Sequence, residues 1–243
     1  MRELDGLTAL ITGAAGGIGE VMAQRFAAAG ARLALIDVRD ASALAASLGP
    51  EHRAFTLDLE NPEAIAAAVL QIGESMGTDI LVNNAGLGIV FPAGETNLDA
   101  WDRTMRINLR APWLMAAAAL PYLKTSGRGR IINMSSQAGV IAIEDHAAYG
   151  ASKAGLINLT RVMAIEWAKF GITTNAIAPT VVETPMALVG WSGEKGEKAK
   201  RDIPVGRFAK PGEIAAAALY LASSDAGIIN GAVLMADGGF SVK

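Results

Sequence analysis

Short apolar runs alternate with longer, alanine-rich stretches along this 243-residue chain, and this alternation restricts its fold more than any other feature. The short runs have the length of strands, and the longer stretches have the periodicity of helices. Strands that are apolar throughout are buried on both faces, as in a parallel sheet covered by helices. The pattern predicts an α/β fold: a doubly wound parallel sheet of about seven strands with helices on both faces.

The expected strands span residues 7–11, 32–36, 54–57, 80–82, 130–134, 173–177 and 232–235. The expected helices span residues 17–29, 62–75, 98–123, 149–169 and 211–223. Pro62 and Pro211 stand where the first turn of a helix tolerates proline. No linker, repeat or low-complexity tract separates two halves, so we expect residues 1–243 to form a single domain.

Composition narrows the class of protein. The apolar share of 51% is high, which suits tightly packed helices and leaves apolar surface for contact between subunits. A net charge of -3 with scattered signs gives no basic stripe, so we expect no nucleic-acid partner. There is no cysteine, no apolar run of membrane-spanning length and no signal-peptide pattern at the start. We therefore expect a cytoplasmic protein.

A glycine-rich segment follows the first expected strand and opens the first expected helix, reading TGAAGGIG over residues 12–19. Glycines let a backbone turn sharply and approach a pyrophosphate, whose charge is favoured by the free amides of a helix start. An ordinary glycine-rich turn is the alternative. The strand before it and the helix after it favour a nucleotide site.

Asp37 ends the second expected strand, eighteen residues after Gly19. A carboxylate there can accept hydrogen bonds from the adenosine ribose hydroxyls and would repel a 2′-phosphate. No Lys or Arg lies inside the glycine turn, and Arg39 is the one nearby cation. NAD is therefore the expected cofactor, and NADP is the less favoured alternative.

Tyr149 and Lys153 lie four residues apart in an expected helix, so they share one face. A free phenol has a pKa of about 10 and is a poor base near neutrality. A fixed positive charge favours the phenolate and lowers that pKa, which makes Tyr149 a candidate general acid or base. Such a pair also arises by chance, so other motifs have to decide.

Three motifs give the chain a family resemblance over essentially its whole length. Its Thr12-Gly13-x-x-x-Gly17-Ile18-Gly19 segment resembles the cofactor motif TGxxxGxG of the classical short-chain dehydrogenases/reductases. NNAG at residues 83–86 matches a second motif of that family. The residues that match its catalytic tetrad in order and spacing are Asn108, Ser136, Tyr149 and Lys153. The implied fold is the Rossmann-like sheet already expected.

The resemblance implies a role for each member of the tetrad. Tyr149 would exchange a proton with the substrate oxygen while hydride moves to or from the nicotinamide. Lys153 would hold the nicotinamide ribose and lower the Tyr149 pKa. Ser136 would hydrogen-bond the substrate oxygen, with Ser135 as the rival for that role. Asn108 would hold a water that links Lys153 to solvent.

The resemblance also assigns cofactor contacts and one departure. Asp58 and Leu59 would lie at the adenine. The turn after the fourth strand would flank the adenosine ribose, through Asn84, Ala85 and Gly86. Pro179 matches the proline of the family's PG motif, with Val182 and Thr184 near the carboxamide. Thr180 replaces the usual glycine; because a β-branched residue disfavours positive φ, we expect the turn to differ and narrow the nicotinamide pocket.

Substrate contacts are expected in two places. The family's substrate loop would span residues 185–210, and its glycine and charge content indicates a mobile polar lid. Trp191 in it either caps the pocket or packs beneath the lid. Gln137, Glu144 and His146 lie between the tetrad's serine and tyrosine, and a polar wall of this kind suits a polyol, sugar or sugar acid. Two scattered histidines do not make a metal site, so none is expected.

Three functions remain open. The first is an NAD-dependent dehydrogenase acting on a secondary alcohol of a small polar substrate. The second is an NADPH-dependent 3-oxoacyl-[acyl-carrier-protein] reductase, for which Lys195, Lys198, Lys200 and Arg201 would supply a basic patch. The third is a non-catalytic dinucleotide-binding subunit, which the complete tetrad disfavours. By resemblance, we expect a homotetramer.

Overall fold

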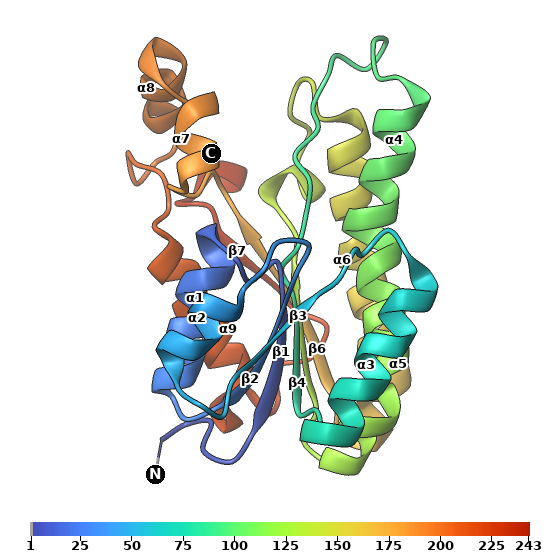
Figure 1. The fold of residues 1–243 in the computed structure, drawn as a ribbon. Coiled ribbons are helices and arrows are strands. Elements are labelled where there is room, and N and C mark those ends of the chain that lie inside the picture. Colours follow the sequence, from blue (N-terminus) through green and yellow to red (C-terminus); the bar gives the residue numbers. More distant parts are fainter. Residues whose placement is uncertain (1) are drawn as a thin grey trace.

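The structure is a computed structural model and describes residues 2–243. Seven parallel strands form one sheet in the order β3-β2-β1-β4-β5-β6-β7 (Figure 1). The strands are β1 Thr8–Thr12, β2 Arg32–Asp37, β3 Arg53–Thr56, β4 Ile80–Asn83, β5 Arg130–Met134, β6 Thr173–Pro179 and β7 Val233–Ala236. The predicted Rossmann-like α/β sheet is confirmed, and each predicted strand is present with its ends moved by no more than two residues.

Helices cover both faces of the sheet (Figure 1). Those on one face are α1 Gly17–Ala28, α2 Ser42–Leu48 and α9 Pro211–Ala222. Those on the other face are α3 Pro62–Met76, α4 Leu98–Met105, α5 Ala111–Ser126 and α6 Ala147–Trp167. Two short helices, α7 Pro185–Gly190 and α8 Gly193–Asp202, lie above the carboxyl ends of the strands. Within residues 2–243, no helix has the length and apolar character needed to cross a membrane.

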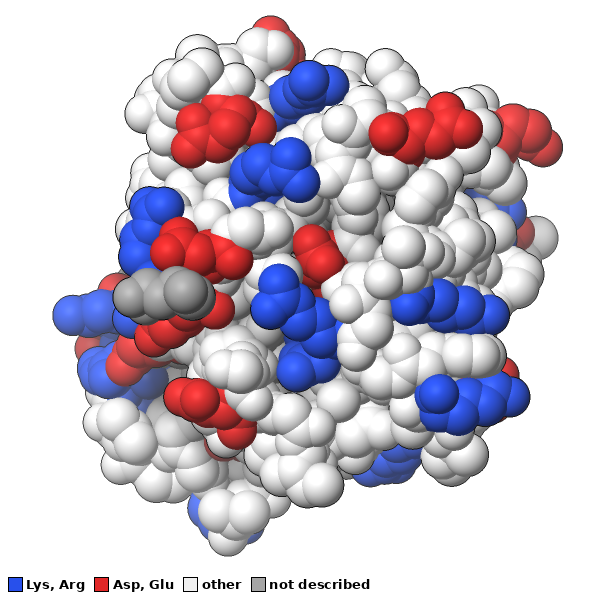
Figure 2. All heavy atoms as spheres, turned by 90° about the horizontal axis from the view of Figure 1, so that it is seen from below, with Lys and Arg blue, Asp and Glu red and all other residues white. Residues whose placement is uncertain are grey.

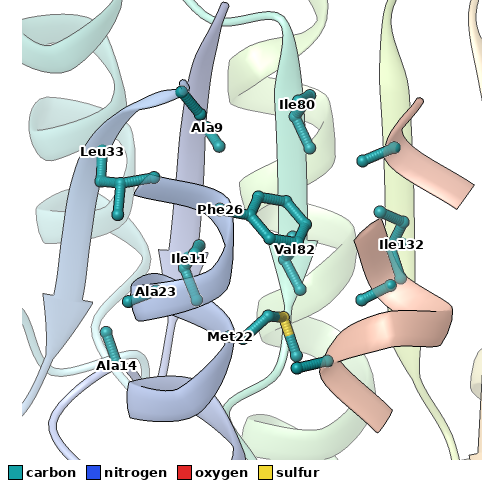
Figure 3. Packing of buried hydrophobic residues seen from close by; sticks show 14 of the residues in the cluster. Ala9, Ile11, Ala14, Met22, Ala23, Phe26, Leu33, Ile80, Val82 and Ile132 are labelled. Atoms are coloured by element: carbon teal, nitrogen blue, oxygen red, sulfur yellow. The ribbon is translucent and has the colours of Figure 1, made fainter. Parts of the chain in front are cut away.

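Alternate residues of the strands contribute to two hydrophobic cores, one on each face. Figure 3 shows the core under α1, where Met22 and Phe26 pack against Ile11 of β1 and Val82 of β4. Leu10, the neighbour of Ile11 in β1, instead joins the core formed with α3 and α5. Full burial of such a side chain stabilises the fold by roughly 1.5–3 kcal/mol.

The strand order reverses between β1 and β4, which are hydrogen-bonded neighbours. Ligands of open α/β sheets bind beyond the carboxyl ends of the strands at such a reversal. The glycine-rich turn follows β1 there, and the NNAG segment follows β4. At the opposite, amino end of the sheet, Figure 2 shows basic and acidic side chains interspersed rather than gathered into a stripe of one sign.

Three segments differ from the prediction. The expected single helix over residues 98–123 is wrong, because a π-helical turn, Arg106–Arg110, separates α4 from α5. The segment 185–210, expected as a loop, contains α7 and α8. Helix α2 was not expected, since its seven residues are too short to show a helical period.

Candidate active site

The glycine-rich turn closes tightly at the carboxyl end of β1. Gly13 has φ +67°, a conformation that L side chains rarely adopt. A Cβ on Gly19 would lie 2.0 Å from the Gly13 carbonyl oxygen, so no side chain fits there. Helix α1 begins at Gly17 without a side-chain cap, which leaves its first amides for another acceptor.

The turn after β4 is knitted to this glycine turn. The Thr12 hydroxyl accepts hydrogen bonds from the Asn84 and Ala85 amides at 3.0 and 3.1 Å. The Asn84 side chain donates to the carbonyls of Thr12 and Gly13 at 3.0 and 3.1 Å. The Asn84 side chain is therefore hydrogen-bonded within the protein. This leaves the backbone of Asn84 and of Gly86 for the expected contact with the adenosine ribose.

Asp37 stands at the end of β2 as the sequence predicted, and its carboxylate faces the glycine turn. It is buried and accepts hydrogen bonds from the Ala15 amide at 2.9 Å and the Arg39 amide at 3.0 Å. The Arg39 guanidinium lies 3.6 Å from the carboxylate and also against Gly16. The negative charge of Asp37 therefore lies beside the glycine turn, and the nearby Arg39 guanidinium offsets part of its effect.

These residues fit a dinucleotide. The backbone at Gly13 and Gly19 is too close-packed for side chains, and uncapped amides at Gly17 suit a pyrophosphate. Asp37 offers a carboxylate to ribose hydroxyls at the distance along the chain that this fold requires. When bound, such a cofactor supplies a nicotinamide that accepts or gives a hydride.

Helix α6 carries Tyr149 and Lys153 on one face, as their spacing predicted. The Lys153 Nζ atom is buried, donates to the Met134 carbonyl at 2.7 Å and lies 5.7 Å from the centre of the Tyr149 ring. Burial lowers the Lys153 pKa from 10.5 to about 8. Lys153 is therefore anchored to the end of β5 beside the phenol.

Burial raises the Tyr149 pKa, and a hydrogen bond with Ser136 opposes that rise. The expectation that Lys153 lowers the Tyr149 pKa is wrong for this arrangement. The reason is tertiary: desolvation disfavours both the phenolate and the ammonium, and spacing along a helix does not report it. Tyr149 is a neutral phenol at neutral pH in this structure.

The two candidate serines have different partners. The Ser135 hydroxyl is buried and donates to the Lys153 carbonyl at 3.0 Å, which ties β5 to α6. Ser136 is partly exposed and hydrogen-bonds with Tyr149. The Ser136 hydroxyl also accepts from the Ala138 amide at 3.2 Å, at the start of a short helical turn. This geometry favours Ser136 as the serine that meets the substrate.

Asn108 lies in the middle of the π-helical turn and is fully buried. Its Oδ1 accepts from the Leu87 amide at 2.8 Å, and its Nδ2 donates to the Leu87 carbonyl at 2.9 Å and to Ser152 Oγ at 3.2 Å. A Cβ on Gly86 would lie 3.3 Å from both Asn108 Oδ1 and Lys153 Nζ. Asn108 and Lys153 therefore meet at Gly86. Because Pro112 has no N–H, the Asn108 carbonyl cannot make the regular α-helical hydrogen bond to the residue four positions later.

The remaining predicted cofactor residues also lie at the carboxyl edge. Asp58 is exposed and Leu59 is buried in the turn after β3. Thr184 caps α7, and its methyl group lies 3.3 Å from a Cβ placed on Gly17. Pro179 ends β6. Among residues 2–243, Asp145 alone of the non-glycine residues has a positive φ, so Thr180 adopts a conformation that a β-branched residue accommodates.

The two ends of the 185–210 segment are joined by backbone hydrogen bonds. Val182 and Ala209 form a parallel bridge, in which the Ala209 amide donates to the Val181 carbonyl at 3.0 Å and the Glu183 amide to the Ala209 carbonyl at 2.8 Å. Trp191 packs edge-on against buried Phe208, with ring centres 6.2 Å apart. This contact favours the second of the two predicted positions for Trp191, beneath the lid.

The other substrate candidates lie between β5 and α6. The His146 ring is edge-on to the Tyr149 ring at 5.8 Å, and His146 precedes α6. Gln137 is buried, and its Oε1 has no hydrogen-bond partner in the described chain. Glu144 and His146 also line a cavity of about 460 Å³ beside α6, which Tyr149 does not line.

Sequence reasoning missed several contributors to the site. The Leu87 backbone and Ser152 hold Asn108, and the Met134 carbonyl holds Lys153. Backbone carbonyls and amides carry no sequence signal, and Ser152 looks like any helix serine. No cluster of three or more potential metal ligands occurs within residues 2–243.

The fold, the two knitted turns and the group around Tyr149 define an oxidoreductase of the short-chain dehydrogenase/reductase family, and the chain belongs to that family. The matching family model is described as enoyl-(acyl carrier protein) reductase and spans residues 13–241. The chain is an NAD(P)-dependent enzyme that acts on CH–OH groups.

Two curated relatives match nearly end to end. The chain is 45% identical to a D-threitol dehydrogenase of Mycolicibacterium smegmatis, over 99% of this chain and 95% of that protein. It is 41% identical to an NAD-dependent glycerol dehydrogenase of Listeria innocua, over 97% and 94%. A solved structure described as a putative NAD(P)-dependent gluconate 5-dehydrogenase from Beutenbergia cavernae, with NADP at low occupancy, matches with TM-score 0.95, 34% identity and coverage of 100% and 99%.

Proposed function

We propose that this enzyme oxidises a secondary alcohol of a small polyhydroxylated substrate, a polyol, sugar or sugar acid, with NAD as its cofactor. The observation that carries the proposal is the grouping of Tyr149, Lys153, Ser136 and Asn108 at the carboxyl edge of the sheet. The names of the relatives, which specify threitol, glycerol and gluconate, support a small polar substrate.

The chain's own groups would move the proton. During oxidation, Tyr149 acts as the phenolate and takes the proton of the substrate hydroxyl; during reduction, it acts as the phenol and gives its proton to the carbonyl oxygen. The Ser136 hydroxyl donates a hydrogen bond to that oxygen as charge develops on it. Lys153 holds the nicotinamide ribose. Because the Tyr149 pKa is raised, we expect oxidation to become faster as pH rises above neutrality.

The cofactor contacts follow the glycine turn and the strand ends. Gly13, Gly17, Ile18 and Gly19 would hold the pyrophosphate, and Asp37 the adenosine ribose. Asp58, Leu59, Ala85, Gly86 and the backbone of Asn84 would surround the adenosine. Pro179, Val182 and Thr184 would meet the nicotinamide end.

Asp37 supports NAD over NADP, since its buried carboxylate would repel a 2′-phosphate. Arg39 reduces that repulsion, because its guanidinium lies beside the carboxylate. An Asp37→Asn variant should therefore gain NADP affinity relative to NAD in paired titrations. Stronger binding of NADP than of NAD by the unaltered enzyme would contradict the proposal.

Four residues remain proposed substrate contacts, and the structure supports them by different observations: His146, Gln137, Glu144 and Trp191. His146 touches the Tyr149 ring, and the unpartnered Oε1 of Gln137 suits a substrate hydroxyl. Trp191 shapes the lid through Phe208. Mobility of the lid and a cytoplasmic location stay predictions.

The carrier-protein alternative is less well supported. Lys200 pairs with Glu197 at 2.8 Å, and Lys195 lies over the Trp191 ring, so α8 presents mixed charge rather than a free basic patch. A screen of polyols, sugars, sugar acids and 3-oxoacyl thioesters with NAD(H) and NADP(H) separates the two functions. Turnover confined to 3-oxoacyl thioesters with NADPH would overturn the polyol proposal.

The proton-transfer role is tested separately. A Tyr149→Phe variant should bind NAD normally and lose roughly 10²–10⁴-fold in turnover. Retained turnover would contradict the assignment of Tyr149. Binding of NAD by the unaltered protein without turnover of any alcohol or ketone would instead favour a non-catalytic dinucleotide-binding subunit.

We also propose a homotetramer. Helix α6 exposes Val162 and Ile165, and α5 exposes Trp113. Large exposed apolar groups of this kind mark contact surfaces. Light scattering should give four times the 25.1 kDa chain mass, and a stable monomer would refute the assignment.

A further inference from the structure

The turn after β3 is tied to the π-helical turn by one carboxylate, that of Glu60. Its two oxygens accept hydrogen bonds from Arg103 Nε at 2.9 Å and Arg106 Nε at 3.0 Å. The Glu60 backbone carbonyl accepts a third from Arg110 Nη2 at 2.7 Å. Two of these three arginines, Arg106 and Arg110, belong to the π-helical turn itself.

The opposite side of the same π-helical turn contacts the segment that carries Tyr149. Asn108 lies between Arg106 and Arg110 and makes its hydrogen bonds with Leu87 and Ser152. Ser152 in turn donates to the Tyr149 carbonyl at 2.7 Å. The turn is thus held on one side by Glu60 and on the other by the segment around Tyr149.

Glu60 also belongs to the adenine side of the cofactor site. Its amide donates to the Asp58 carboxylate at 2.9 Å, and the Asn61 amide donates to the Asp58 carbonyl at 3.2 Å. Asp58 and Leu59 are the proposed adenine contacts. A displacement of Glu60 therefore moves the adenine end of the site.

The charge balance makes this link sensitive to one residue. Glu60 supplies the one carboxylate that pairs with Arg103 and Arg106 among residues 2–243. Burial works to raise the Glu60 pKa, but hydrogen bonds and charge from these two arginines outweigh it and leave that pKa lowered. The Arg110 Nε atom is buried without a hydrogen-bond partner among the described residues. Without the carboxylate, Arg103 and Arg106 would lose the acceptor that they share.

We propose that Glu60 is a positioning residue that couples the adenine end of the cofactor site to Asn108 through the π-helical turn. It touches neither the reacting atoms nor, by its side chain, the cofactor. It fixes the π-helical turn that presents Asn108 to Leu87 and Lys153. The inference rests on the proposed roles of Asp58 and Asn108 in the site.

Amide hydrogen exchange tests the coupling without cofactor or turnover. In Glu60→Gln, the Leu87 amide, which donates to Asn108 Oδ1, should exchange on the order of tenfold faster, together with peptides covering residues 104–112. Glu60→Asp keeps the charge and should restore part of the protection. Asp5→Asn is the matched control, because it removes a carboxylate that pairs with Arg2 at 2.9 Å elsewhere, and it should leave Leu87 unchanged.

Cofactor affinity and a double-mutant cycle test the functional half. Glu60→Gln should weaken NAD binding roughly 3–10-fold in a titration and lower kcat, whereas Asp5→Asn should change neither. In an Asn108→Ala background, Glu60→Gln should lower kcat no further, since it acts through Asn108.

The outcomes separate this inference from the proposed function. A lower Tm of Glu60→Gln with unchanged Leu87 exchange and NAD affinity would overturn the coupling and leave a stabilising ion pair. Additive losses of kcat in the cycle would also overturn it. Faster Leu87 exchange in a protein that oxidises no polyol would support the coupling and refute only the proposed substrate class.

Discussion

Replacing Lys153 by methionine should change how the stability of the enzyme depends on pH. Lys153 is buried with its Nζ on the Met134 carbonyl, and burial lowers its pKa from 10.5 to about 8. Between those values the unfolded chain binds a proton at this lysine that the folded chain does not. The free energy of unfolding therefore rises with pH through the window from about 8 to 10.5.

The magnitude follows from the pKa difference. Each pKa unit between folded and unfolded states corresponds to about 1.4 kcal/mol, so this residue contributes a change of about 3 kcal/mol across the window. Methionine has a similar length and no charge, so Lys153→Met should lack that contribution. The free energy of unfolding of the variant minus that of the unaltered enzyme should fall by about 3 kcal/mol from pH 7 to above pH 10.5.

Urea denaturation of both proteins without cofactor, at several values between pH 6.5 and 11, measures this difference. Titrating groups elsewhere affect both proteins alike and cancel in the subtraction. Parallel pH profiles would show that the folded-state pKa of Lys153 is unperturbed, and the argument from burial would fail. Loss of turnover in the variant is expected in either case and decides nothing about the pKa.

The remaining predictions concern the turns around the site. Gly19→Ala would place a methyl group 2.0 Å from the Gly13 carbonyl oxygen, so NAD binding measured by fluorescence titration should be lost; unchanged affinity would contradict the tight turn. Ser136→Ala should lower kcat about 10²-fold, whereas Ser135→Ala should mainly lower the free energy of unfolding, by about 1 kcal/mol; reversed effects would exchange their roles. Asp145 has φ 65°, so Asp145→Gly should raise the free energy of unfolding by about 1 kcal/mol in urea denaturation, and a lower value would show that its side chain is needed.

The parts of the site that the sequence could predict are those that local chain geometry determines. The glycine turn follows a strand and opens a helix, and Tyr149 and Lys153 meet because four residues make one turn of α6. Asp37 was predictable because the end of a parallel strand fixes where its side chain lies.

The parts that escaped prediction depend on contacts between distant segments. The π-helical turn inside the expected 98–123 helix is held by Glu60 on one side and by Leu87 on the other, which lie far away in sequence. The direction of the Tyr149 pKa shift follows from burial, which only the assembled fold shows. Helices α7 and α8 are too short for their periodicity to stand out from a glycine-containing, charged segment.

The bridge between Val182 and Ala209 has a consequence for how the family could diversify. It joins the two ends of the lid before the lid begins, so the closure of that loop does not depend on the helices between them. Lengthening a loop whose ends are already joined costs little, about 0.6 kcal/mol for each doubling. The segment between Val182 and Ala209 can therefore be replaced, by evolution or by grafting, without displacing the sheet, the glycine turn or Tyr149.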